Sequence, residues 1–146
     1  MLSLKNLSTA DRKRPLSNLD ADLKSGKIYT ILGRTGAGKT ELLRAIMGLD
    51  DISGGHLELD GQDLAKRPVR KRQMSMVYQQ FINYPHLTVL KNVAFPLRRQ
   101  GLSAEDASGR ALVALELVGL AGFEGRMPSE LSGGQQQRVA IARAIV

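Results

Sequence analysis

Apolar and polar positions follow one another in short blocks along this chain, and the blocks predict both strands and helices. Residues 28–32 (Ile-Tyr-Thr-Ile-Leu) form an apolar run rich in β-branched side chains, which is typical of a buried strand. A glycine-rich stretch follows, and beyond it apolar residues share one face of a helix that Gly48 can end. These residues are Leu42, Leu43, Ile46 and Met47. The expected order is therefore strand, loop, helix.

Alternating runs on both sides of this block predict a small antiparallel sheet lying against it. Residues 2–5 alternate as an edge strand would, and residues 8–17 are polar, as in a loop or hairpin. Residues 56–60 alternate again and end at the turn signal Asp60-Gly61.

A second apolar run, residues 74–78, predicts another core strand, and Gln79 follows it directly. A polar amide at the point where a strand emerges near a phosphate site is well located to bind a ligand. From the residues alone, however, a ligand role for Gln79 is the less favoured interpretation.

Residues from about 81 to 130 are expected to form a helical insertion, with Pro85 and Pro96 punctuating its start. Ser103 followed by Glu105 and Asp106 is typical of a capped helix start. Apolar residues at helical spacing come next, and Gly119 can close the helix. They are Ala107, Ala111, Leu115 and Val118.

Length and composition place the chain among globular proteins. Its 146 residues correspond to about one domain, and 42% of them are hydrophobic. No apolar run is long enough to span a membrane, and the start lacks an apolar signal-peptide core, which favours a cytoplasmic protein. The absence of cysteine excludes disulfides and thiolate metal sites.

The formal net charge is +7, and two basic clusters, residues 12–14 and 66–72, supply much of it. A basic surface is compatible with a solvated face, an anionic membrane or nucleic acid. Only 4% of residues are aromatic, so stacking platforms for bases are scarce and no nucleic-acid partner is expected.

The glycine-rich stretch reads G-x-x-x-x-G-K-T, the pattern of a phosphate-binding loop. Its residues are Gly33, Arg34, Thr35, Gly36, Ala37, Gly38, Lys39 and Thr40. Glycines let the backbone curl so that its N–H groups point at one anion, and the following helix adds its free amides and positive dipole end. Lys39 supplies a positive charge for the β- and γ-phosphates, and the Thr40 hydroxyl can bind Mg²⁺. The loop therefore predicts nucleotide triphosphate binding.

A second motif consists of Leu131, Ser132, Gly133, Gly134 and Gln135. Ser132 and Gln135 have the spacing of a capping box, and apolar residues follow at helical intervals. By itself the stretch predicts a helix whose N-terminus could receive an anion, or only a helix cap.

Taken together, these motifs resemble the nucleotide-binding domain of ATP-binding cassette (ABC) transporters. The resemblance rests on the phosphate loop, on Gln79 after a strand, on the helical segment, and on residues 131–138 (Leu-Ser-Gly-Gly-Gln-Gln-Gln-Arg), and it covers nearly all of the chain. Residues 84–89 (Tyr-Pro-His-Leu-Thr-Val) with Asn92-Val93 look most like the carbohydrate and glycerol-phosphate importer branch.

The resemblance implies a fold and its boundaries. The fold is α/β, a P-loop NTPase core with a small antiparallel β subdomain and a helical subdomain, incomplete at the C-terminus. Residues 1–80 would form the nucleotide-binding core with the β subdomain. Residues 81–135 would form the helical subdomain, which ends with the family's signature motif, residues 131–135. Residues 136–146 would begin the return to the core.

The resemblance also implies roles for individual residues. Residues 33–40 would bind ATP and Mg²⁺, with Lys39 and Gln79 as catalytic residues and Thr40 and Gln79 at the metal. Residues 131–135 would close over the γ-phosphate of ATP held by a partner ATPase, which implies a head-to-tail dimer. The segment from Phe81 to Val93 would receive transmembrane permease subunits at the inner face of the cell membrane.

Three departures from the family pattern matter. The chain ends at Val146 before any Walker B strand, D-loop or switch histidine, so on its own it is expected to hydrolyse ATP poorly. No aromatic residue precedes Tyr29 to stack on adenine, and Glu41 stands where the family has a small hydroxyl residue. These last two departures suggest a weak nucleotide site and a dimer with a non-identical ATPase.

The function implied by the resemblance is ATP-driven import of a solute, with a sugar or polyol favoured. Two other classes share the signature, namely ATPases of DNA repair and chromosome maintenance, and soluble cassettes acting on the ribosome. The first class interrupts its motifs with long coiled coils or zinc modules, whereas the insertion here is short and free of cysteine.

Overall fold

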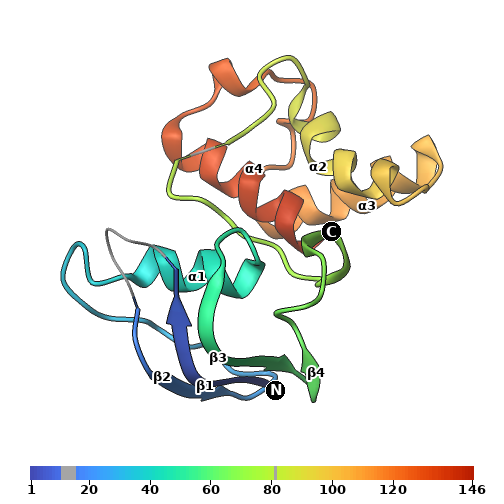
Figure 1. Ribbon diagram of the computed structural model, residues 1–146. Coiled ribbons are helices and arrows are strands. Elements are labelled where there is room, and N and C mark those ends of the chain that lie inside the picture. The colour runs from blue at the N-terminus through green and yellow to red at the C-terminus, as the bar shows by residue number, and fades with distance from the viewer. Residues whose placement is uncertain (11–15, 81) are drawn as a thin grey trace. The chain divides into compact units, whose positions relative to one another are not determined.

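The computed structural model describes residues 1–10, 16–80 and 82–146, which divide into two compact units, residues 1–74 and 75–146 (Figure 1). None of the helices in these ranges has the length and apolar character needed to cross a bilayer. The expected domain boundaries at residues 80 and 135 remain predictions, and each unit is described by itself below.

The first unit contains a four-stranded antiparallel sheet in the order β2-β1-β3-β4. Its strands are β1 (Leu2–Thr9), β2 (Leu19–Leu23), β3 (Ile52–Leu59) and β4 (Gln62–Asp63). The predicted antiparallel sheet is confirmed, but β1 is a central strand because it pairs with β2 on one side and β3 on the other. The expectation of an edge strand at residues 2–5 was therefore wrong.

A tight turn joins β3 to β4, as the Asp60-Gly61 signal predicted. Both turn residues have positive φ, 49° at Asp60 and 77° at Gly61, which is the conformation a two-residue hairpin turn requires. At the other hairpin, β1 continues to Thr9, so the expected loop begins later than residue 8. The rest of that loop falls largely on residues 11–15, which lie outside the described residues.

Helix α1 (Lys39–Met47) covers the sheet, and Gly48 ends it in the left-handed conformation, as predicted. Leu42 and Ile46 of α1 pack with four other buried leucines of the first unit to form its core. These are Leu4, Leu7, Leu57 and Leu64. Leu43 is 44% exposed, so the apolar face of α1 is narrower than the sequence pattern indicated.

Neither predicted core strand forms. Residues 28–32 have no strand pairing, and Ile28 and Leu32 are 98% and 87% exposed. Residues 74–78 are also unpaired, directly after Gln73 with φ 51°. Both predictions were wrong because a buried parallel strand is stable only beside neighbouring strands, and every strand in the described ranges belongs to the antiparallel sheet.

The second unit is helical, as expected for the segment from about 81 to 130. Its elements are α2 (Val89–Arg99), α3 (Ala104–Leu117), the short 3₁₀ helix η2 (Pro128–Glu130) and α4 (Gly133–Ile145). Residues from all three α-helices build its core, including Val93, Leu97, Leu115 and Val139. Pro96 lies inside α2, in its last turns, so it does not mark the start of the segment.

Two predicted helix features of this unit are confirmed. Ser103 caps α3 by accepting a hydrogen bond from the Asp106 N–H at 3.0 Å. Ala107, Ala111 and Leu115 are fully buried on one face of α3, and Gly119 follows its C-terminal cap.

One buried arginine closes the end of α1. Arg72 follows the 3₁₀ helix η1 (Val69–Lys71) and is only 5% exposed. Its Nη1 donates to the carbonyl oxygens of Ile46 at 2.7 Å and Ala45 at 3.3 Å, and its Nε donates to Arg67 O at 3.1 Å. Burial lowers the pKa of Arg72, and the charge of Asp63 opposes that shift. The guanidinium thus satisfies C-terminal carbonyls that the helix cannot pair itself.

Replacing Arg72 with Met should lower the free energy of unfolding by about 2–3 kcal/mol, because buried carbonyls of α1 would lose charged donors. Urea denaturation measures this, with Arg70→Met as the control because Arg70 is exposed on the same segment. Equal midpoints for the two variants would contradict the role given to Arg72.

Candidate functional site

The phosphate loop, residues 33–40, lies between the exposed segment 28–32 and helix α1. Gly36 and Gly38 have φ of 85° and 86°, so the backbone takes the left-handed conformation at two positions before the helix begins. At Gly38 the positive φ favours glycine, and an added Cβ would also require the Leu16 side chain, 2.6 Å away at Cδ2, to shift. The Ala37 N–H donates to Arg34 O at 3.1 Å and closes a turn inside the loop.

The Lys39 side chain forms hydrogen bonds with the backbone of the phosphate loop. Its Nζ donates to Gly33 O and to Arg34 O, both at 2.8 Å. The ammonium group therefore sits where the first residues of the loop and the first turn of α1 meet. Its third N–H remains available for a ligand oxygen, since an ammonium group carries three donors.

The N-terminus of α1 faces this loop without a side-chain cap. Its N-cap residue, Gly38, offers no side-chain acceptor, so the amides of Lys39 and Thr40 have no partner within the helix. Thr40 is exposed and Glu41 is half-buried in the first turn. Uncapped amides, a dipole end and a lysine ammonium group converge here, which is the chemistry that binds a phosphate chain.

The donor set also fits the metal that phosphate sites use. In the described part of the chain, no three His, Cys, Asp or Glu side chains are placed to hold a metal ion. Mg²⁺ differs from other metals in needing only one or two protein ligands beside phosphate oxygens and water. The exposed Thr40 hydroxyl is such a ligand.

Gln79 and residues 131–135 belong to the second unit, and the phosphate loop to the first. Gln79 is exposed at a bend that follows the unpaired segment 74–78. Each group is therefore described within its own unit.

The second motif forms a complete capping box at the start of α4. Ser132 Oγ accepts from the Gln135 N–H at 3.3 Å, and Gln135 Oε1 accepts from the Ser132 N–H at 2.9 Å. Gly133 and Gly134 form the first turn and are exposed, whereas Leu131 is buried in the core. The sequence prediction of this box is confirmed, and it leaves the two glycine amides facing solvent at the helix N-terminus.

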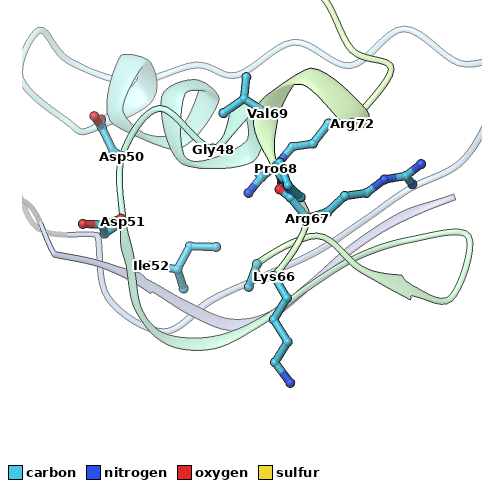
Figure 2. A pocket seen from close by; sticks show the side chains of 10 residues that line it. Gly48, Asp50, Asp51, Ile52, Lys66, Arg67, Pro68, Val69 and Arg72 are labelled. Carbon is cyan, nitrogen blue, oxygen red and sulfur yellow. Dashed lines mark hydrogen bonds between the residues drawn. The ribbon is translucent and has the colours of Figure 1, made fainter.

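Figure 2 shows a pocket of about 400 Å³ in the first unit, away from the phosphate loop. Asp50 and Asp51 lie on one side, and Arg67 and Arg72 on the other. Arg44 binds Asp50 through two hydrogen bonds of 2.8 and 2.7 Å, which lower the pKa of Asp50. Asp50 is thus paired with an arginine outside the pocket lining, and Arg72 is engaged with backbone carbonyls, so both serve the structure of this unit.

Sequence reasoning missed three polar residues of the second unit that the structure brings together. Asn92, Asn83 and Arg143 form hydrogen bonds that connect residues 82–88 with helices α2 and α4. The signal for Asn92 was a polar residue beside Val89 and Val93 on the apolar face of a helix, because such a residue must find buried partners.

Comparison with protein families gives a match over residues 16–146 to the model described as ABC transporter. The chain is 43% identical over 146 residues to a ferric ion import ATP-binding protein of Haemophilus influenzae, covering 99% of the chain and 44% of that relative. It is 46% identical over 136 residues to a spermidine/putrescine import ATP-binding protein of Salmonella typhimurium, covering 93% of the chain and 36% of the relative. The chain thus spans less than half the length of these relatives.

Among solved structures, the chain is similar to MJ0796, described as a bacterial ABC transporter cassette in dimeric form. The TM-score is 0.87 at 35% identity, covering 99% of the chain and 69% of that structure. A second structure of the same cassette, in a post-hydrolysis state bound to ADP and phosphate, matches equally well. The sequence expectation of a P-loop NTPase fold with a small antiparallel sheet and helices is confirmed.

Replacing Ser132 with Ala should destabilise α4 by about 1 kcal/mol, because the Gln135 N–H would lose its acceptor. Ser132→Asn is the control, since asparagine caps helices equally well. Chemical denaturation followed by circular dichroism measures both variants, and equal stability of the Ala and Asn variants would contradict a capping role.

Proposed function

The chain belongs to the ABC transporter family, and we propose that it is the ATP-binding part of the energy-coupling subunit of an importer. The observation that carries this proposal is the phosphate loop, with its Lys39 ammonium group beside the uncapped N-terminus of α1. The printed functions of the ferric ion and polyamine relatives, both import ATP-binding proteins, support the direction of transport.

In the proposed site, the backbone N–H groups of Gly36 and of residues 38–40 would bind the phosphate oxygens of ATP, and Lys39 would bind the β- and γ-phosphates. Lys39 keeps its carbonyl contacts in the loop and uses its free N–H toward the ligand. Mg²⁺ would be held by the Thr40 hydroxyl and Gln79, and when bound it neutralises charge on the phosphates. Gln79 would also orient the attacking water.

We assign the capping box of α4 to ATP held by a second ATPase subunit, in a head-to-tail dimer. Ser132 accepts one hydrogen bond through Oγ, so its own O–H remains free to donate to a phosphate oxygen. The exposed amides of Gly133 and Gly134 add donors at a positive helix end. The dimeric form of the similar cassette supports this arrangement.

The segment 82–88, called the docking loop from here on, is proposed to receive the permease subunits together with the start of α2. Ile82 is 53% exposed, and Pro85 and His86 are also exposed. Apolar and aromatic groups at one exposed loop suit a protein partner. Binding there would hold the subunit at the inner face of the membrane.

The solute is the least constrained part of the proposal. Residues 84–89 favour a sugar or polyol, whereas the relatives named above import ferric ions or polyamines. Uptake assays with the full-length subunit and its permease, using labelled maltose, glycerol-3-phosphate, ferric ion and spermidine, distinguish these classes. Uptake of ferric ion or spermidine alone would overturn the sugar assignment.

Replacing Lys39 with Ala should abolish ATP-dependent uptake and weaken ATP binding by at least about tenfold, because a charge-assisted contact worth about 1.5–3 kcal/mol is lost. The fold should remain, since the ammonium group contacts only two loop carbonyls. Equilibrium binding of a fluorescent ATP analogue measures the effect, with Lys27→Ala as the control at an exposed lysine. Wild-type binding and uptake by the Lys39 variant would overturn the function given to this loop.

Glu41 bears on the proposed pairing with a non-identical ATPase. Its carboxylate follows Thr40 in the first turn of α1 and adds negative charge near the phosphate site. Glu41→Thr should tighten ATP binding by about fivefold, the effect of removing a repulsion of about 1 kcal/mol. The gain should shrink at high salt, because exposed charges are screened. No gain at low salt, together with full uptake by a homodimer, would contradict the weak-site proposal.

A further inference from the structure

The docking loop is joined to helix α4 at two points. Arg143, near the end of α4, donates through Nη2 to Ile82 O. Asn83 Nδ2 donates to Gln136 O in the first turns of α4, at 3.0 Å. Gln136 and Arg143 are seven residues apart, about two helical turns, so both contacts use one face of α4. The loop therefore lies along the helix that begins at the signature motif.

Asn92 fixes the shape of the docking loop from the side of α2. It is 0% exposed, and its Oδ1 accepts from the Tyr84 N–H at 2.7 Å. Its Nδ2 donates to Tyr84 O at 3.0 Å and to Leu87 O at 2.8 Å. Arg143 Nη1 lies 3.5 Å from the same Asn92 oxygen. Buried, mutually polarising hydrogen bonds of this kind hold a single backbone arrangement.

The guanidinium of Arg143 also packs on an aromatic ring of the loop. Its Cζ lies 5.0 Å from the centroid of the Tyr84 ring, and that ring lies 4.7 Å from the ring of Phe95 in α2. A planar guanidinium can stack and donate in several directions at once, which a lysine ammonium group cannot do. The position therefore requires arginine rather than any positive charge.

The second contact between the docking loop and α4, made by Asn83, lies next to the signature motif. Gln136 accepts from Asn83 through its carbonyl, while its Nε2 donates to Leu131 O at 3.2 Å. Asn83 Oδ1 is buried without a hydrogen-bond partner in the described residues, so this contact leaves part of its amide unsatisfied. Asn83 makes one hydrogen bond to α4, whereas Arg143 contacts Ile82, Asn92 and the Tyr84 ring, so Arg143 makes most of the connection.

We propose that Arg143 is a positioning residue that fixes the docking loop on α4, so that a partner bound at the loop and an anion bound at the signature act on one rigid helix. The identities of partner and anion rest on the proposed function, whereas the connection between loop and helix does not. Arg143 touches neither ligand in this arrangement and acts through Ile82, Tyr84 and Asn92.

The test uses the full-length subunit with Arg143→Lys, which keeps the charge and the aliphatic stem. Arg110→Lys is the matched control, because Arg110 is exposed on α3 of the same unit. Hydrogen–deuterium exchange should be faster in residues 82–88 of the Arg143 variant and unchanged in the control. ATP hydrolysis by the subunit alone should remain unchanged, while its stimulation by the reconstituted permease should fall by about 2- to 30-fold.

Unchanged exchange and unchanged stimulation in Arg143→Lys would overturn the proposal, as would an equal loss of basal and stimulated hydrolysis, which marks a purely structural residue. Tyr84→Leu, which removes only the ring under the guanidinium, should reproduce part of the exchange effect. If the wild-type subunit is not stimulated by the permease, the proposed function fails, and the exchange experiment still decides whether Arg143 fixes the loop.

Discussion

Backbone hydrogen bonds decide which segments of the first unit become regular structure. Strand β1 has partners on both sides, and its buried leucines Leu4 and Leu7 pack under α1. Residues 28–32 are more apolar, yet no described strand lies beside them, so their polar groups meet water and their side chains are exposed. The phosphate loop is therefore shaped by its own contacts, chiefly those of Lys39, and by the start of α1.

The features predictable from the sequence are those whose causes lie within a few residues. The Asp60-Gly61 turn and the caps at Ser103 and Ser132 depend on neighbouring backbone groups, and all three formed as expected. Arg72 and Arg143 depend on partners 26 and 61 residues away, so a local pattern gives no indication of them. The failure of the core strands has the same origin, because a strand is a property of its neighbours.

For the site, spacing alone predicted the phosphate loop and the capping box. The capping box is confirmed, and the family that the motifs resemble is the family to which the chain belongs. The solute was harder to predict for a physical reason. In the proposed arrangement the solute contacts the permease rather than the ATPase, so residues such as Tyr84 would report on a protein interface and only indirectly on a substrate class.

The N-termini of α1 and α4 differ in how they are capped. Gly38 gives α1 no side-chain acceptor, so the start of this helix has no side-chain cap and can donate amides to a ligand. Ser132 already satisfies one amide of α4. A phosphate that binds there uses the remaining donors, and when it leaves, the capped amide keeps its partner. The capping box thus stabilises the start of α4 and leaves Gly133 and Gly134 exposed for a ligand.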